Sequence, residues 1–249
     1  MRLLKKVFTP PFSSDLWNEA IRGQAVLAGL TVQEQERLWA LAHTLLHKTS
    51  IQTVGELVLN ETDYLRIALL VSLPILNLDL DWYRGLHEII IYPEAFAPRH
   101  VWQDEFGITH QDRQLLAGEA WDQGLMLLSW HEVETSGPLD GHHVVIHECA
   151  HWLDMQNGTA NGRPPLHRGV DSEDWLKHFS DAYTAFTTSP HRSCAALDTY
   201  AAKNPAEFFA VCCELFFERA LVLKHCWPEI YRLLVAFFQQ TPDNRAVSV

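Results

Sequence analysis

The chain contains the run His147-Glu148-Cys149-Ala150-His151, which places two histidines four residues apart with a glutamate directly after the first. On a helix, residues i and i+4 lie on the same face, so both imidazoles can reach a single metal ion. Glu148 projects from a neighbouring part of the helix surface, where it can take a proton from a water molecule on that ion. The run therefore predicts a zinc hydrolase, with His147 and His151 as ligands and Glu148 as the general base.

A surface helix that carries two solvated histidines is the alternative explanation for this run. Apolar residues flank the run on both sides, Val144-Val145-Ile146 before it and Trp152-Leu153 after it. They indicate a helix that is buried over much of its circumference, where unpaired polar groups are unfavourable. We therefore favour the metal site.

A catalytic zinc ion usually takes three protein ligands and keeps the fourth position for water. A metzincin would need glycine at position 154 and histidine at position 157, but the chain has Asp154 and Asn157 there, which excludes that class. The remaining common solution is a glutamate from a later helix. The acidic residues that follow include Glu173, Asp181, Asp198, Glu207, Glu214 and Glu218.

Glu207 stands out among these acids because Asn204-Pro205-Ala206-Glu207 opens a strongly apolar helix. A carboxylate on such a rigid, half-buried element is well placed to be a ligand. The same four residues also fit a capping box, in which Glu207 would only stabilise the start of the helix. Glu214, two turns further along nearly the same face, is the second candidate, so the spacing alone leaves the third ligand open.

The elements around these residues are predicted to be mostly helical. Periodicity and capping signals predict helices over residues 14–28, 31–46 and 60–73, from a cap at Asp140 to Asn157-Gly158, and from Trp175 onward. Residues 88–92 and 124–130 predict strands, and residues 157–174 predict a loop over the site. We expect an α+β, predominantly helical fold in one domain over residues 1–249, with a mainly helical N-terminal part (1–80) and a catalytic core (85–240).

The net charge of -12, with scattered lysines and arginines, argues against nucleic acid or an anionic membrane as a partner. The most apolar stretch, residues 67–80, is interrupted by polar residues and a proline, and the basic start has no apolar continuation. Neither a membrane span nor a signal peptide is therefore predicted. The five cysteines are odd in number and form no C-x-x-C pair, which suits a reducing cytoplasm better than a disulfide framework.

Two segments of the chain carry a family resemblance. Residues 141–154 resemble the active-site helix of the Mlc titration factor A family of bacterial metallopeptidases, and residues 200–210 resemble that family's second motif. The upstream run Leu127-Leu128-Ser129-Trp130 and the chain length also agree, so the resemblance covers most of the chain. His143 and Cys149 depart from the residues expected in that family, but neither occupies a ligand position.

The resemblance implies a gluzincin-like enzyme with a zincin-like core and one Zn²⁺ per chain. His147, His151 and Glu207 would be the zinc ligands and Glu148 the general base, and Tyr200 would direct its hydroxyl at the oxyanion. Members of the family are described as cytoplasmic peptidases that act on small peptide-like substrates with aminopeptidase character. They are also described as binding the glucose repressor Mlc, which relieves the repression of sugar-uptake genes.

Several interpretations remain open at the level of sequence. The chain could instead be a regulatory protein that sequesters a transcription repressor and has a structural or nearly silent zinc site, or a zinc hydrolase that does not act on peptides. Asp154 could hydrogen-bond a ligand imidazole or be a surface acid. The strand at 124–130 could bind an extended peptide at its edge or be purely structural. His142 and His143 are interpreted as N-terminal helix residues, and Cys212-Cys213 as core residues.

Overall fold

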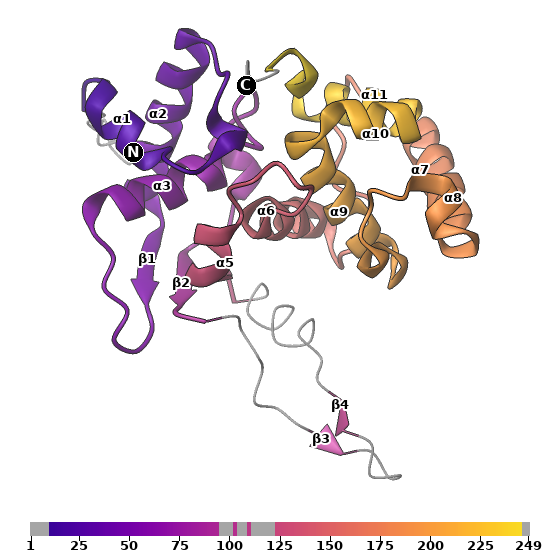
Figure 1. Ribbon diagram of the computed structural model, residues 1–249, viewed down its shortest axis with the longest axis horizontal. Coiled ribbons are helices and arrows are strands. Elements are labelled where there is room, and N and C mark those ends of the chain that lie inside the picture. The colour runs from indigo at the N-terminus through magenta and orange to yellow at the C-terminus, as the bar shows by residue number, and fades with distance from the viewer. Residues whose placement is uncertain (1–9, 95–101, 104–108, 111–122, 246–249) are drawn as a thin grey trace, which may run out of the picture.

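The computed structural model describes residues 10–94, 102–103, 109–110 and 123–245. In this part of the chain the protein is predominantly helical, with one three-stranded parallel sheet and one antiparallel pair (Figure 1). The sheet has the order β1-β2-β5, from β1 (Ser50–Thr53), β2 (Glu88–Tyr92) and β5 (Leu125–Ser129); the pair is β3 (Trp102–Gln103) with β4 (Thr109–His110). The predicted α+β, predominantly helical fold class is confirmed.

The helices fall into three groups along the chain. The N-terminal group is α1 (Ser14–Ala20), α2 (Val32–Lys48) and α3 (Glu61–Ser72); the central group is α5 (Trp130–Thr135) and α6 (Val144–Asp154); the C-terminal group is α7 (Ser172–Thr188), α8 (Pro190–Cys194), α9 (Pro205–Glu218), α10 (Ala220–Cys226) and α11 (Pro228–Phe238). Short 3-10 turns join them: η1 (Ala25–Leu27), η2 (Leu80–Tyr83), η3 (Met155–Asn157), η4 (Thr199–Ala202) and η5 (Pro242–Arg245).

Helix α2 begins at its predicted capping signal. The Thr31 side chain accepts the N–H of Glu34 at the start of α2, and Glu34 returns the contact to Thr31, so the capping box is complete. The predicted helix over 14–28 is wrong in length, because α1 ends at Ala20 and the chain then turns through Gly23 at φ 80°. Only glycine adopts that conformation without strain, so the helix cannot continue through it.

Strand β2 is the centre of the sheet and pairs in parallel with β1 and with β5. Its residues Ile89 and Ile91 are fully buried, as the β-rich sequence predicts. Strand β5 fills most of the predicted strand 124–130, after which the chain enters α5. The sequence does not predict β1, because this strand has only four residues and obtains its hydrogen bonds from β2, which is distant in the sequence.

Helix α6 occupies the centre of the molecule, between the N-terminal helices and the C-terminal group (Figure 1). It packs most extensively against α9 and also contacts α3 and β5. Its apolar residues Val145, Cys149 and Leu153 are fully buried. The buried hydrophobic residues form one cluster that extends from Trp17 to Phe238, so the helix with the two histidines lies inside the shared core.

The cysteines show one departure from the sequence-based expectation. Cys194 at the end of α8 and Cys226 at the end of α10 form a disulfide with a Cα–Cα distance of 5.5 Å. The spacing does not reveal this pair, because the two residues are 32 positions apart and meet only when the helices pack. Cys212 and Cys213 are fully buried, as predicted for core residues. None of the helices in the described ranges has the length and apolar character needed to cross a bilayer.

Candidate metal centre

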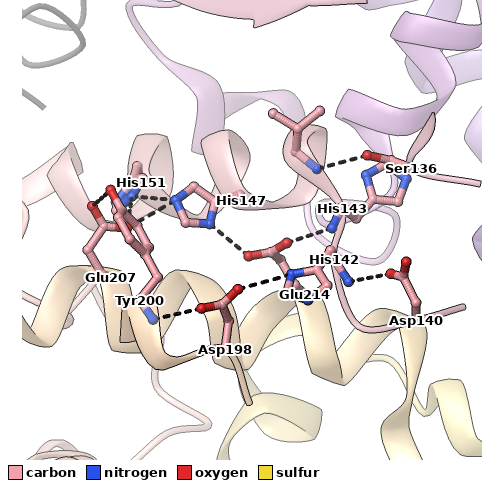
Figure 2. Close-up of polar contacts among 11 residues, drawn as sticks. Ser136, Asp140, His142, His143, His147, His151, Asp198, Tyr200, Glu207 and Glu214 are labelled. Atoms are coloured by element: carbon pink, nitrogen blue, oxygen red, sulfur yellow. Dashed lines mark hydrogen bonds and ion pairs between the residues drawn. The ribbon is translucent and has the colours of Figure 1, made fainter. Parts of the chain in front are cut away.

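Helix α6 brings the two histidines of the run together. Nε2 of His147 lies 3.1 Å from Nε2 of His151, one turn along the same face (Figure 2). The helix begins after His143, whose backbone is extended at φ -146°, so the predicted N-cap at Asp140 is wrong. Asp140 instead accepts the N–H of His142, within the turn that leads into the helix.

The first turn of α9 supplies the third side chain. Asn204 accepts the backbone N–H of Glu207 at 2.9 Å and Pro205 follows it, so the predicted capping signal is real. Oε2 of Glu207 lies 3.1 Å from Nε2 of His147 and 3.3 Å from Nε2 of His151. The Asn204 cap therefore positions the side chain of Glu207. The same segment can cap α9 and also supply the third ligand.

These three side chains form a group that could hold a metal ion. Their nitrogen and oxygen atoms all lie within 4.8 Å of one another. Ligand atoms that surround a tetrahedral zinc ion at about 2.0–2.1 Å are about 3.3 Å from each other, close to the separations in this site. Two imidazole nitrogens and one carboxylate oxygen are also the donor types that zinc prefers. The residues present therefore fit the metal that the sequence predicts.

The electrostatics of the group favour positive charge at its centre. Burial alone would raise the pKa of Glu207, but hydrogen bonds from His147 and His151 outweigh it and hold that pKa far below its usual range. Burial would lower the pKa of His147, but the charge of Glu214 and hydrogen bonds to Glu207 and Glu214 raise it well above its usual value. A proton or a metal cation bound at this point would therefore balance the negative charge of the buried carboxylates of Glu207 and Glu214.

Tyr200 lies on η4 at the edge of the group. Asp198 caps this turn by accepting the N–H of Tyr200 at 2.8 Å. The Tyr200 hydroxyl donates to Oε1 of Glu207 at 3.0 Å, while 41% of the residue remains exposed. The structure therefore places this hydroxyl beside the three-residue group, where a bound substrate could also reach it.

A cavity of about 520 Å³ opens over these residues. Glu148 is 9% exposed and contributes to its wall, together with the group of three and Tyr200. The remaining lining residues are Glu132, Thr135, Ser136, Asp140, His142, His143, Val144, Asp198, Val211 and Glu214. All five residues predicted for the site therefore surround one space.

Glu214, the second candidate for the third ligand, occupies a different place. Its Oε1 lies 2.8 Å from Nδ1 of His147, the ring nitrogen that faces away from the group (Figure 2). Its Oε2 accepts the backbone N–H of His143 at 2.5 Å. The position of Glu214 two turns after Glu207, on nearly the same face of α9, makes it a candidate third ligand in the sequence, whereas in the structure its side chain contacts Nδ1 of His147.

Asp154 matches neither of the two roles considered for it from the sequence, and the loop over residues 157–174 does not cover the site as predicted. Asp154 is fully buried and accepts the N–H groups of Asn161, Gly162 and Arg163, each at 2.7 Å. Burial raises its pKa, and these hydrogen bonds partly offset the effect. Asp154 is therefore neither a surface acid nor bonded to a ligand imidazole in the contacts described, and no residue of 157–174 lines the cavity.

The strand predicted as a peptide-binding edge does not reach the cavity. Among the described residues, β5 contributes none to the lining, which takes Glu132, Thr135 and Ser136 from the α5 region that follows it. His142 and His143 lie in the approach to α6, outside the group of three. The ring of His143 is fully buried, and neither of its nitrogens has a hydrogen-bond partner in the described structure.

The fold and the site together define a class, a metallopeptidase-like protein whose two histidines and one glutamate could hold a metal ion. The sequence model of the family "Glucose-regulated metallo-peptidase M90" matches residues 2–239. The chain belongs to this family.

Two relatives from Yersinia agree with this assignment. Mlc titration factor A from Yersinia pestis (strain Pestoides F) is 37% identical over 233 residues, which cover 92% of this chain and 86% of that protein. The protein of the same name from Yersinia pseudotuberculosis (serotype O:3, strain YPIII) gives the same values of 37%, 92% and 86%. The solved structure of a PRO-PRO endopeptidase from Paenibacillus alvei is similar over 77% of this chain and 97% of its own, at a TM-score of 0.42 and 16% identity. The family resemblance stated from the two motifs is confirmed.

Proposed function

We propose that the protein is a zinc-dependent peptidase with His147, His151 and Glu207 as zinc ligands. The observation that carries this proposal is the convergence of the three donor atoms, within 4.8 Å of one another, in the wall of a cavity that also contains Glu148. A solvated surface helix would not gather these groups at a buried point. Membership of a metallopeptidase family supports the same conclusion.

The side chains around the centre have distinct proposed roles. A zinc ion held there would supply Lewis-acid chemistry, which makes water more acidic and polarises a carbonyl group. Glu148 accepts the proton of the attacking water and passes it to the nitrogen of the leaving amine. The Tyr200 hydroxyl donates a hydrogen bond to the oxygen that becomes negative as the carbonyl is attacked. Glu148 and Tyr200 are thus the proposed catalytic residues.

The charge of the cavity wall supports an aminopeptidase-like preference. Beyond the three-residue group and Glu148, the wall contains the carboxylates of Glu132, Asp140 and Asp198, and the described lining includes no lysine or arginine. Such a wall attracts the ammonium group at the free N-terminus of a peptide. We infer that unblocked small peptides bind better than the same peptides with an acetylated N-terminus.

The test of the enzymatic proposal is the substitution Glu148→Gln. We expect the variant to keep stoichiometric zinc and to lose activity on aminoacyl nitroanilides by at least about 100-fold, because glutamine cannot accept the proton. Glu56→Gln, on an exposed loop, is the matched control and should behave like the parent. Near-normal turnover of the Glu148 variant would exclude its role as base, and hydrolysis of esters without peptides would favour a different hydrolase.

A second proposed function is the binding of a transcription repressor in the cytoplasm. The name of the relatives, Mlc titration factor A, favours it, at 37% identity over 92% of this chain. The Glu148→Gln variant separates the two functions, because a repressor-binding surface does not need the general base. Pull-down of a purified Mlc-type repressor by the variant and by the parent should be equal; no binding by either would reject this function.

A further inference from the structure

The side chain of Glu214 connects the metal centre to the start of the helix that carries it. One carboxylate oxygen lies 2.8 Å from Nδ1 of His147, and the other accepts the N–H of His143, the N-cap residue of α6. The residue is 5% exposed, so water screens neither contact strongly. A single buried carboxylate thus contacts α6 at two points that are four residues apart.

The contact with His147 determines which ring nitrogen carries the proton. Nε2 of His147 faces Nε2 of His151 and Oε2 of Glu207, so it must present a lone pair to bind a cation there. Nδ1 then carries the hydrogen and donates it to Glu214. A carboxylate in this position fixes the tautomer, restricts rotation of the ring and makes the metal-facing nitrogen more basic.

The contact with His143 determines where the helix begins. His143 provides no side-chain cap to α6, so the helix start depends on partners from elsewhere. Glu214 places a carboxylate at this end, where the helix dipole favours negative charge. Because Glu207 lies on the same helix as Glu214, α9 supplies both the proposed third ligand and the group that aligns α6 with it.

We propose that Glu214 is a positioning residue of the metal centre, which orients the imidazole of His147 and fixes the start of α6 through its two carboxylate oxygens. The proposal rests on the proposed role of His147 as a metal ligand. It assigns to Glu214 a part in metal affinity that acts through His147 and the start of α6, not as a ligand of the metal.

Glu218 provides a matched control on the same helix. Its Oε2 accepts the N–H of Gly141 at 3.0 Å, and the residue is 6% exposed, so it also connects α9 to the approach of α6. The described contacts join it to no metal-binding residue. Burial raises the pKa of Glu218 to about 8, with the charges of Asp140 and Glu214 adding to the effect, so glutamine resembles its neutral form.

The experiment compares Glu214→Gln, Glu214→Leu and Glu218→Gln with the parent. Zinc affinity is measured by competition with a chromophoric chelator, and folding by thermal unfolding of the metal-free proteins. We expect Glu214→Gln to bind zinc about 10-fold and Glu214→Leu about 100-fold more weakly, since loss of such outer partners costs about 10–100-fold. Glu218→Gln should bind zinc as the parent does. Equal losses at positions 214 and 218, or no loss at 214, would overturn the proposal.

A second measurement needs no variant. In the zinc-loaded parent, long-range ¹⁵N NMR of the histidine rings should show the hydrogen of His147 on Nδ1 and the metal on Nε2. The reverse assignment would overturn the proposal even if the variants at position 214 failed to fold. A parent that binds no zinc would instead reject the proposed function, so the two failures are distinguishable.

Discussion

The proposed catalytic role of Tyr200 depends on its hydroxyl group alone. Its hydroxyl donates to Oε1 of Glu207 at 3.0 Å, so the hydroxyl is held beside the proposed metal site before any substrate arrives. We expect Tyr200→Phe to lower kcat by about 100-fold, the size of effect found when an oxyanion donor is removed. Zinc content by mass spectrometry should remain stoichiometric.

The control for this substitution is Tyr183→Phe. That hydroxyl donates to the carbonyl of Ala202 at 3.1 Å, so it bonds to the same turn, η4, but lies outside the cavity lining. It should leave kcat close to that of the parent. Loss of zinc from Tyr200→Phe would show that the tyrosine supports the ligand Glu207 instead of the oxyanion.

His143 predicts a pH dependence of stability. Burial lowers the pKa of this ring from 6.5 to about 4, with the nearby Asp140 opposing the shift. Between these values the unfolded chain binds more protons than the folded one, so the free energy of unfolding falls as the pH drops from 6.5 towards 4. The shift corresponds to at most about 3.4 kcal/mol at 1.36 kcal/mol per pH unit.

The variant that tests this effect is His143→Leu, which has a similar volume and no titratable group. Compared with the parent by urea unfolding of the metal-free proteins, it should lose less stability between pH 6.5 and pH 4.5. The metal-free form is used so that release of zinc in acid does not add to the slope. Parallel pH profiles of the two proteins would contradict a neutral, buried His143.

The run from His147 to His151 was predictable at the residue scale because its spacing is local. Four residues on a helix define one face, so His147 and His151 converge wherever the helix lies. The contacts of Glu214 and Asp154 were not predictable, because they join groups 67 and 7–9 positions apart through the packing of α9 and the path of a loop. The position of an acidic residue in the sequence does not determine which N–H groups lie beside its carboxylate in the fold.

At the scale of the elements, the end of α6 depends on Asp154. Its carboxylate accepts three backbone N–H groups at 2.7 Å and so holds the loop that follows η3. We expect Asp154→Asn to lower the free energy of unfolding by about 2–4 kcal/mol, because the amide turns donors towards these N–H groups and leaves buried groups unsatisfied. The measurement is urea unfolding, with limited proteolysis to locate the loosened loop.

The matched control is Asp181→Asn, on the exposed side of α7. It should change stability by less than about 0.5 kcal/mol, as surface substitutions usually do. Because residues 157–174 do not line the cavity, the folded Asp154 variant should keep its kcat at low temperature. A large loss of kcat with unchanged stability would instead place Asp154 in the support of the metal centre.

The elements themselves were predicted where local signals were strong. The capping box at Thr31 and Glu34 and the β-rich run 88–92 correspond to α2 and β2. Strand β1 and helix α5 were missed, because their short sequences carry weak preferences that neighbouring strands and helices decide. The same limit explains the loop over 157–174, whose existence follows from its composition but whose position depends on Asp154.

At the scale of the whole molecule, the disulfide between Cys194 and Cys226 was hidden from sequence because it follows from how α8 and α10 pack. The position of the site was hidden for the same reason. Its residues come from α6, η4 and α9, and α6 belongs to the core that the N-terminal and C-terminal helices share. The candidate metal centre is therefore coupled to the packing of both parts of the chain.

This coupling predicts that the chain unfolds as a single unit, in line with one domain over residues 1–249. Helix α6 contacts α3 on one side and α9 on the other, so neither part keeps its core when the other is lost. Differential scanning calorimetry should show one transition. Zinc at about 100 times its dissociation constant should stabilise the fold by about 2.7 kcal/mol and raise Tm by about 5–10 °C. Two transitions, of which zinc shifts only one, would show that the N-terminal helices form a separate domain.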